Sequence, residues 1–386
     1  MSDETKMQDA PGDTPSGSAS RNGKAKIDKY FRAMSKHSAS DMHMKADTPV
    51  KFRIQGSIHN IDASPLSTED IEGLVFEIMD DRQMASYAEK GSIDLAYQVA
   101  GGDRYRVNVF RQRGRTSIAA RRVPKDIKTF KELNLPESLG ELCGLHQGLI
   151  LLAGITGSGK STTIAAMLEE INRNRACHIM TVEDPIEFLF EDKKAFISQR
   201  EIGLDVANFH EALKYLMRED PDVVLIGELR DPETYGAALS AAETGHLVFG
   251  TIHSASASAT IARILELYPE DARGLIRSSL VFTLQAIIGL KLLPGLRPDI
   301  PLVPCCEVLI CNSTVRKLIA DGRDHELNSV IRNSAHEGMI DFTESLRTLV
   351  DRELISTKTA YAAAPNPDEL KMRLKGISVT SGGIIG

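Results

Sequence analysis

Residues 154–161 combine glycines with a lysine and a hydroxyl side chain at a spacing that suits phosphate binding. The segment reads Gly-Ile-Thr-Gly-Ser-Gly-Lys-Ser and matches the complete Walker A pattern. In that pattern backbone N–H groups curl around phosphate oxygens, Lys160 neutralises the β- and γ-phosphates, and the Ser161 hydroxyl can ligate Mg²⁺. We therefore expect a nucleoside triphosphate and Mg²⁺ to be bound by Gly154, Thr156, Gly157, Ser158, Gly159, Lys160, Ser161 and Thr162.

Carboxylates at the ends of two later apolar segments could serve Mg²⁺ and the attacking water at such a site. The first segment, which begins at Ile179, ends in an acidic turn, and spacing alone does not choose among its carboxylates Glu183, Asp184 and Glu187. The second, residues 222–228, delivers Glu228 to a strand end, with Gly227 at the usual position of the Walker B aspartate. Glu228 is therefore the candidate general base.

Two histidines bracket another apolar run, residues 247–252. A single histidine is more often structural than functional, so either one alone would carry little weight. At opposite ends of one strand in a nucleotide-binding sheet, His253 is the better candidate for a γ-phosphate sensor and His246 the poorer one.

The segments around these residues predict the elements that position them. The apolar run 148–153 suits a buried parallel strand, and a helix should begin near Lys160 with Ile164, Ala165 and Leu168 on its buried face. Strand and helix patterns then alternate along the chain, which predicts a parallel sheet with right-handed crossovers. The alternative, a fortuitous glycine-rich turn, does not explain a strand before the loop and a helix after it.

The region before residue 124 has a different, α+β pattern. Residues 50–54 alternate as a strand, Ser67 and Asp70 suit a capping box, and residues 93–99 and 105–109 read as a hairpin. In that hairpin Arg104 and Arg106 share the face opposite Tyr105, at the start of a basic stretch, residues 104–122. The stretch suits an anionic partner, and the alternative is a solvated sheet face.

Length and composition limit the class of protein. A chain of 386 residues, 42% apolar and 26% charged, predicts about two globular domains. The net charge of −7 argues against a dedicated nucleic-acid binder. The sequence shows neither a membrane-spanning run nor a secretory signal, so we expect a cytoplasmic protein. The expected domains are a disordered tail (1–26), an N-terminal domain (27–123), a linker (124–140), an ATPase domain (141–362) and a flexible tail (363–386).

Four motifs in this order resemble the secretion ATPase superfamily and, within it, the PilT-like ATPases of type IV pili and twitching motility. They are the Walker A loop and residues 181–188, 218–231 and 243–254. The resemblance implies a homo-hexameric ATPase with a PAS-like N-terminal domain and a RecA-like, parallel-sheet P-loop domain. It also implies that the ATPase lies at the cytoplasmic side of the inner membrane and acts on a pilus platform protein. Pilus retraction is the first expected function.

The resemblance also implies roles for individual residues. It places the Walker A, Asp box, Walker B and His box motifs on Lys160, Glu183, Glu228 and His253, with Glu183 also a candidate Mg²⁺ ligand. It further implies that Arg104 and Arg106 contact phosphate in the closed state, as arginine fingers do.

One motif departs from the PilT-like pattern, which leaves other functions open. Where those ATPases carry Ala-Ile-Arg-Asn-Leu-Ile-Arg-Glu, residues 314–321 read Thr-Val-Arg-Lys-Leu-Ile-Ala-Asp. The alternatives to retraction are therefore pilus assembly and a role in type II/IV secretion. However, the four-cysteine element usual in the assembly and type II branches is absent. A RecA-like nucleic-acid translocase and a small-molecule kinase are more distant alternatives.

Overall fold

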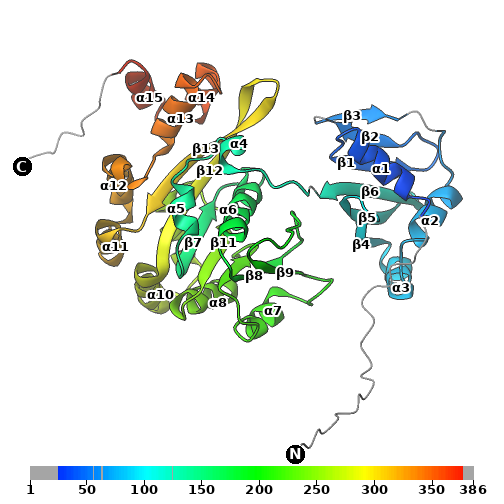
Figure 1. Cartoon of the computed structure of the whole chain (residues 1–386), viewed down its shortest axis with the longest axis horizontal. Helices are drawn as coiled ribbons and strands as arrows, with labels where there is room; N and C mark the ends of the chain where they lie inside the picture. Colours follow the sequence, from blue (N-terminus) through cyan, green and yellow to red (C-terminus); the bar gives the residue numbers. More distant parts are fainter. Residues whose placement is uncertain (1–24, 55, 62–63, 124, 377–386) are drawn as a thin grey trace, which may run out of the picture. The chain divides into compact units, whose positions relative to one another are not determined.

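The computed structural model describes residues 25–54, 56–61, 64–123 and 125–376. They form two compact units, one ending at Val123 and one beginning at Pro124, which we describe separately (Figure 1). The expected N-terminal tail, residues 1–26, lies outside the described residues except for Ala25 and Lys26.

The first unit is a six-stranded antiparallel sheet with three helices. The strand order is β3-β2-β1-β6-β5-β4. Its strands are β1 (Asp41–Lys45), β2 (Lys51–Ile54), β3 (Ser57–Asn60), β4 (Ser92–Gln98), β5 (Arg104–Gln112) and β6 (Arg115–Val123). Its helices are α1 (Asp28–Lys36), α2 (Thr68–Phe76) and α3 (Asp81–Lys90). The α+β composition expected for this part of the chain is confirmed.

Local signals in the sequence explain these elements. The Ser67 side chain accepts from the Asp70 amide and the Asp70 side chain accepts from the Ser67 amide, both at 3.0 Å, so the expected capping box begins α2. In β5 Tyr105, Val107 and Val109 are buried, and they pack with apolar residues of α1 and α2 in one core. The strand alternation places Arg104 and Arg106 on the other face of the sheet.

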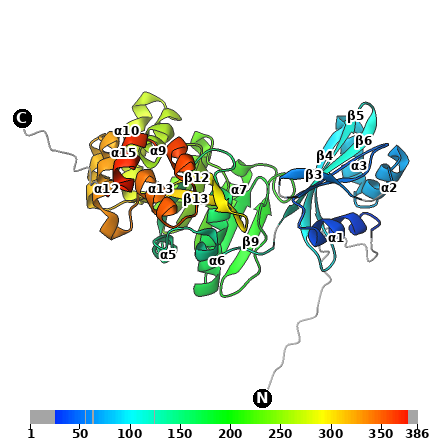
Figure 2. The ribbon, with the colours of Figure 1, turned by 90° about the horizontal axis from the view of Figure 1, so that it is seen from above.

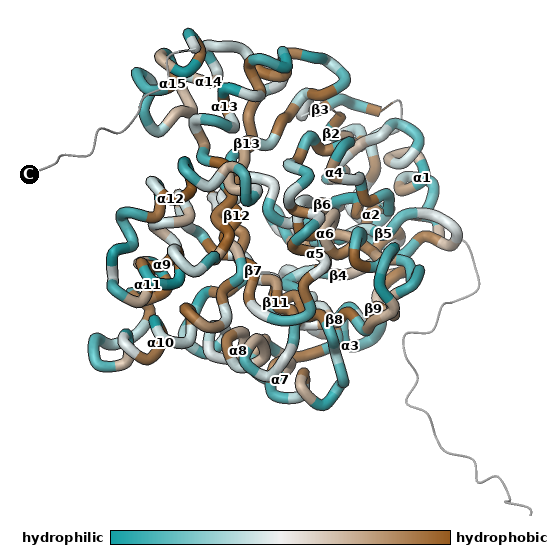
Figure 3. Tube along the Cα trace, turned by 60° about the vertical axis from the view of Figure 1, so that its left-hand side comes forward, coloured by the Kyte–Doolittle hydropathy of each residue, from teal (hydrophilic) through white to brown (hydrophobic). Residues whose placement is uncertain are grey.

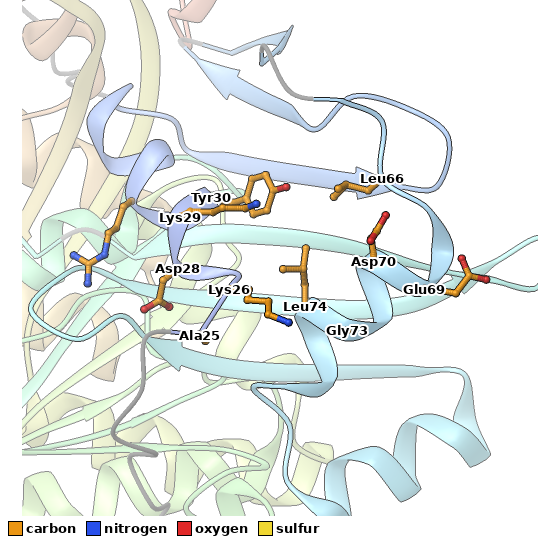
Figure 4. A pocket seen from close by; sticks show the side chains of 11 residues that line it. Ala25, Lys26, Asp28, Lys29, Tyr30, Leu66, Glu69, Asp70, Gly73 and Leu74 are labelled. Atoms are coloured by element: carbon orange, nitrogen blue, oxygen red, sulfur yellow. The ribbon is translucent and has the colours of Figure 1, made fainter.

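A pocket of about 580 Å³ lies in this unit and is lined mainly by α1, the residues just before it, and α2 (Figure 4). Its charged lining is mixed, with cations at Lys26, Lys29 and Arg32 and carboxylates at Asp28, Glu69 and Asp70. None of the arginines expected to contact phosphate lines it, so it is separate from the predicted chemistry.

The second unit is built on a seven-stranded sheet of order β13-β12-β7-β11-β10-β8-β9. All neighbouring strands run parallel except β12 and β13, which form an antiparallel hairpin. The strands are β7 (Gly148–Ala153), β8 (His178–Glu183), β9 (Phe196–Glu201), β10 (Val223–Ile226), β11 (Leu247–Ile252), β12 (Leu284–Arg297) and β13 (Ile300–Ile310). Strands β7, β10 and β11 are buried along their whole length, and Figure 3 shows the hydrophobic residues concentrated on the central strands. The expected parallel sheet is confirmed.

Helices cover both faces of this sheet. Apolar residues of α5 (Leu139–Cys143) and α6 (Lys160–Asn174) pack on one face. The other face carries α7 (Phe209–Leu216), α8 (Pro232–Glu243), α9 (Ala257–Glu266), α10 (Glu270–Thr283) and α11 (Ser313–Ala320). The last helices of the described part are α12 (Leu327–Asn333), α13 (Phe342–Asp351), α14 (Thr357–Ala363) and α15 (Pro367–Leu374). In Figure 2 α13 and α15 lie near the hairpin.

Two expected segment boundaries are wrong. The expected linker 124–140 contains α4 (Phe130–Leu133), and Leu135 and Leu139 are buried in the core beneath α6, so packing begins before residue 141. The expected flexible tail contains α15, which Asn366 caps and whose Leu370 is fully buried. Asn366 at the N-cap and Pro367 at the first helical position form a helix start signal. The expectation of a flexible tail did not take this signal into account. Residues 377–386 lie outside the described part of the chain.

Candidate nucleotide-hydrolysis site

The loop between β7 and α6 prepares an anion-binding helix end. Gly157 and Gly159 have φ values of +77° and +97°, which L side chains rarely adopt. Gly159 is the N-cap of α6, so no side chain accepts from the first amides of the helix. The first turn contains no acidic residue and begins with Lys160, which is unfavourable beside the positive helix end. An external anion would satisfy these amides and the lysine together, which fits a phosphate.

Close packing also fixes the start of the loop. A Cβ on Gly154 would stand 2.4 Å from the Ser158 Oγ and 2.7 Å from the Leu290 carbonyl oxygen, so glycine is required there. The Ser158 hydroxyl is buried, and within the described chain it has no hydrogen-bond partner. An unsatisfied hydroxyl inside a phosphate loop again fits a polar ligand.

Lys160 is directed back at its own loop. Its Nζ donates to the carbonyl oxygens of Gly154 at 2.7 Å and Ile155 at 3.1 Å. Burial lowers the pKa of Lys160, while the charges of Glu228 and Glu187 oppose that shift. Glu228 and Glu187 therefore lie close enough to the ammonium group to influence its charge.

Glu228, at the end of β10, is held by two cationic or potentially cationic side chains. Its Oε2 accepts from Arg230, and its Oε1 lies 3.1 Å from His253 Nε2. The hydrogen bond from Arg230 lowers the pKa of Glu228, more strongly than the charges of His253 and Lys160 do. The structure thus brings together Lys160, Glu228 and His253, which the sequence had placed on three different segments.

Glu183 lies at the end of the neighbouring strand β8 and has a different environment. Its Oε1 accepts from the Thr181 hydroxyl at 2.7 Å and from Gln199 Nε2 at 3.2 Å, and the carboxyl is almost buried. Burial raises the pKa of Glu183, against the effect of these hydrogen bonds. Glu183 and Glu228 therefore end adjacent strands of the sheet, and their pKa values shift in opposite directions.

The glycine in the usual Walker B aspartate position has a steric explanation. A Cβ on Gly227 would lie 3.2 Å from both the Glu183 Cα and the Val182 carbonyl oxygen. The ends of β8 and β10 therefore approach so closely that a side chain at position 227 would require them to shift by a few tenths of an ångström. The Thr251 hydroxyl donates to the Gly227 carbonyl at 2.7 Å and ties the same turn to β11.

The two histidines at the ends of β11 have different surroundings. His246 Nδ1 lies 2.9 Å from the Ala241 carbonyl oxygen and 3.2 Å from the Thr244 hydroxyl, at the end of α8. It therefore has local structural partners, whereas His253 faces Glu228.

Arg104 and Arg106 belong to the first unit, where they lie on the sheet face opposite the core. Arg106 pairs in register with Arg121, and Arg121 donates to Asp41 at 2.7 Å. Across the residues that the structure describes, Arg106 has no ion pair of its own. Like charges directly opposite on neighbouring strands are destabilising, so Arg106 carries an uncompensated charge on this face.

Sequence reasoning missed three residues that hold the carboxylates. Thr181 could have been found, since it lies two residues before Glu183 and so shares its strand face. Arg230 lies two residues after Glu228, but its orientation toward that carboxylate depends on the turn after β10. Gln199 reaches Glu183 only because β9 pairs with β8, which the sequence does not reveal.

A Walker A loop at the end of the central strand β7, with carboxylates at the ends of β8 and β10 in the same parallel sheet, defines a RecA-like P-loop ATPase. Residues 22–300 match the family model described as "Type II/IV secretion system protein". The chain belongs to this family.

Several relatives are similar over nearly their whole length. The type IV pilus retraction ATPase PilT of Pseudomonas aeruginosa is 39% identical over 86% of this chain and 96% of its own. A twitching motility protein of Neisseria gonorrhoeae is 38% identical over 84% of this chain and 86% of its own. The crystal structure of the pilus retraction motor PilT with bound ADP superimposes with a TM-score of 0.84 at 41% identity, over 90% of this chain and 99% of that one. Among the helices that the structure describes, none is long and apolar enough to cross a membrane.

Proposed function

We propose that this chain is the motor ATPase of a type IV pilus and that it drives pilus retraction. The observation that carries the proposal is the Lys160, Glu228 and His253 cluster at an uncapped helix end, in a fold that matches a pilus retraction motor along almost its whole length. We further propose a homo-hexamer on the cytoplasmic face of the inner membrane that acts on a pilus platform protein.

In this proposal the residues of the cluster share the work of ATP hydrolysis. Lys160 and the amides of residues 157–162 bind the phosphates, and Ser161 with Glu183 would hold Mg²⁺, which supplies charge neutralisation when bound. Glu228 accepts the proton of the attacking water, and His253 orients that carboxylate. Arg104 and Arg106 reach the phosphates when the PAS-like domain closes, so that phosphate release can be coupled to domain movement.

Two experiments test this function. Purified protein should release free phosphate from ATP in stoichiometric amounts, and Glu228→Gln should bind ATP without turnover. Loss of the gene should abolish surface motility and leave excess surface pili. Loss of pili would instead indicate assembly, and phosphate transferred to an acceptor other than water would contradict an ATPase motor.

One observation favours a second candidate, a secretion or assembly role. In residues 314–321 the retained positions are structural: Arg316 donates to the Phe282 carbonyl, and Leu318 and Ile319 are buried. Five positions depart from the retraction motif. Four of them, Thr314, Lys317, Ala320 and Asp321, are exposed on or beside α11, and the fifth, Val315, is buried and stays apolar. The fold-forming half of the motif is thus kept and its surface half is changed, which suits a different partner.

A further inference from the structure

Glu307 is a buried carboxylate on β13 that no step of the proposed hydrolysis uses. It is 5% exposed. In the sheet register Glu307 lies opposite Gly289, Gly289 opposite Ala153, and Ala153 opposite Ile252. The phosphate loop begins directly after Ala153, and His253 follows Ile252. Glu307 therefore stands level with the strand ends that carry the candidate site.

Its side chain crosses the neighbouring strand to reach a helix. A Cβ on Gly289 would lie 3.3 Å from the Glu307 Cβ, a tight contact, and 3.5 Å from its Oε2, an ordinary contact, so the side chain of Glu307 passes directly beside Gly289. Glu307 Oε2 accepts from the Ala257 amide at 2.6 Å, in the first turn of α9. Lys291, Arg332 and Asp341 are the charged side chains that influence it.

Burying this carboxyl is costly, which argues against a purely stabilising role. Burial raises the pKa of Glu307 from 4.5 to about 7, although the hydrogen bond from Ala257 opposes the shift. A carboxylate with that shift disfavours its own ionised form at neutral pH.

The segment that Glu307 anchors is short and contains His253. Only residues 253–256 join β11 to α9. Ser256 caps the helix by accepting from the Ala259 amide at 3.2 Å, and the Ser254 hydroxyl donates to the Ser256 carbonyl at 3.3 Å. The strand fixes one end of this segment, and Glu307 fixes the other end four residues beyond His253.

We propose that Glu307 is a positioning residue for ATP hydrolysis, which holds the start of α9 so that His253 stays against Glu228. This inference rests on the proposed roles of His253 and Glu228. Glu307 itself touches neither nucleotide nor water in this scheme.

A double-mutant cycle in the full-length protein tests the proposal, with steady-state kcat, KM for ATP and ADP affinity as readouts. Glu307→Leu should lower kcat roughly ten- to a hundredfold, as misplacement of a catalytic group does, and leave ADP affinity within about twofold. Glu307→Gln keeps an acceptor for the Ala257 amide and should retain most of the activity. In a His253→Ala background, Glu307→Leu should have no further effect, because the group that it positions is gone.

Hydrogen exchange and a matched control separate positioning from misfolding. Exchange of residues 253–260 should accelerate in Glu307→Leu and not in Glu307→Gln. Glu369→Gln alters another buried carboxylate, on α15, and should leave kcat per folded molecule unchanged. If Glu307→Leu lowered kcat equally in the native and the His253→Ala backgrounds, the positioning role of Glu307 would be refuted, and the proposed ATPase function would stand. An unchanged kcat in His253→Ala would refute the role of His253 and this inference with it.

Discussion

The buried carboxyl of Glu307 should make the stability of the ATPase unit fall as pH rises, and Glu307→Gln should remove that dependence. Its pKa is raised from 4.5 to about 7 because the side chain is buried. Between these values the folded chain binds more protons at this position than the unfolded chain, so the free energy of unfolding decreases with pH. The stabilisation is fully present below pH 4.5 and is lost as pH rises through 7.

The magnitude follows from the size of the shift. A difference of about 2.5 pKa units corresponds to roughly 3.4 kcal/mol over the whole titration. About 2 kcal/mol of this falls between pH 5.5 and 8.5, where the protein can be studied. Relative to the native chain, Glu307→Gln should therefore gain about 2 kcal/mol of stability across that window. If burying the glutamine amide itself changes the free energy of unfolding, it does so by the same amount at every pH and leaves the slope unchanged.

Urea titrations followed by circular dichroism, repeated at several pH values, measure this slope. The chain contains no tryptophan, so fluorescence is a poor probe. The transition of the ATPase unit can be recognised because ADP should shift it, as a ligand that binds only the folded state does. The reasoning is refuted if the native and Glu307→Gln proteins lose stability with pH in parallel.

Glu169→Gln is the matched control, because this buried glutamate has the opposite shift. Burial opposes ionisation of Glu169, but hydrogen bonds from Lys193, Asn172 and Arg173 outweigh it and lower its pKa. Its stabilisation is present above its usual pKa of 4.5 and is lost only at lower pH. Glu169→Gln should therefore destabilise the protein by a nearly constant amount between pH 5.5 and 8.5.

Three further predictions concern binding, turnover and stability. Lys160→Ala should abolish measurable ADP binding in equilibrium dialysis, because the ammonium is the cation of the phosphate loop; retained affinity would contradict that role. Arg104→Ala and Arg106→Ala should each lower ATP turnover by up to roughly 10³ while ADP affinity stays within a few-fold, as for arginine fingers. Unchanged turnover in both would remove the proposed coupling to domain closure. Leu370→Ala should destabilise the C-terminal helices by about 2 to 5 kcal/mol in urea without changing kcat, and no loss of stability would show that α15 is not packed.

The chemistry of the site could be predicted from the sequence because it lies in contiguous motifs. The loop 154–161 specifies its own conformation through glycines, and the buried strand and helix beside it have strong local patterns. The strands that deliver Glu228 and His253 are likewise short apolar runs with a functional residue at one end. Because parallel strands align their carboxyl ends, membership of one parallel sheet was enough to place these residues at the same edge, although their order along the chain does not give the strand order.

The residues that hold the carboxylates depend on pairing across the sheet, which local patterns do not encode. Gln199 reaches Glu183 because β9 adds to the sheet in a particular register, and Glu307 reaches α9 because β13 pairs with β12 so that the side chain passes beside Gly289. The C-terminal helix α15 was missed for a related reason. Its stability comes from Leu370 in the core and from ion pairs of Arg373 with Asp341 and Glu369, rather than from a long amphipathic pattern.

The uncompensated charge of Arg106 argues for a functional sheet face rather than a solvated one. Arg53, Asp41, Arg121 and Arg106 follow one another in register across four strands, and Asp41 pairs with Arg53 and Arg121 and leaves Arg106 without an ion pair among the described residues. Asp41 lies 2.7 Å from Arg121 and 3.7 Å from Arg53. A merely solvated face would gain stability from replacing Arg106 with a neutral residue, since directly opposed like charges repel. An anion that arrives during the catalytic cycle removes that penalty, and the triphosphate of the proposed reaction is such an anion.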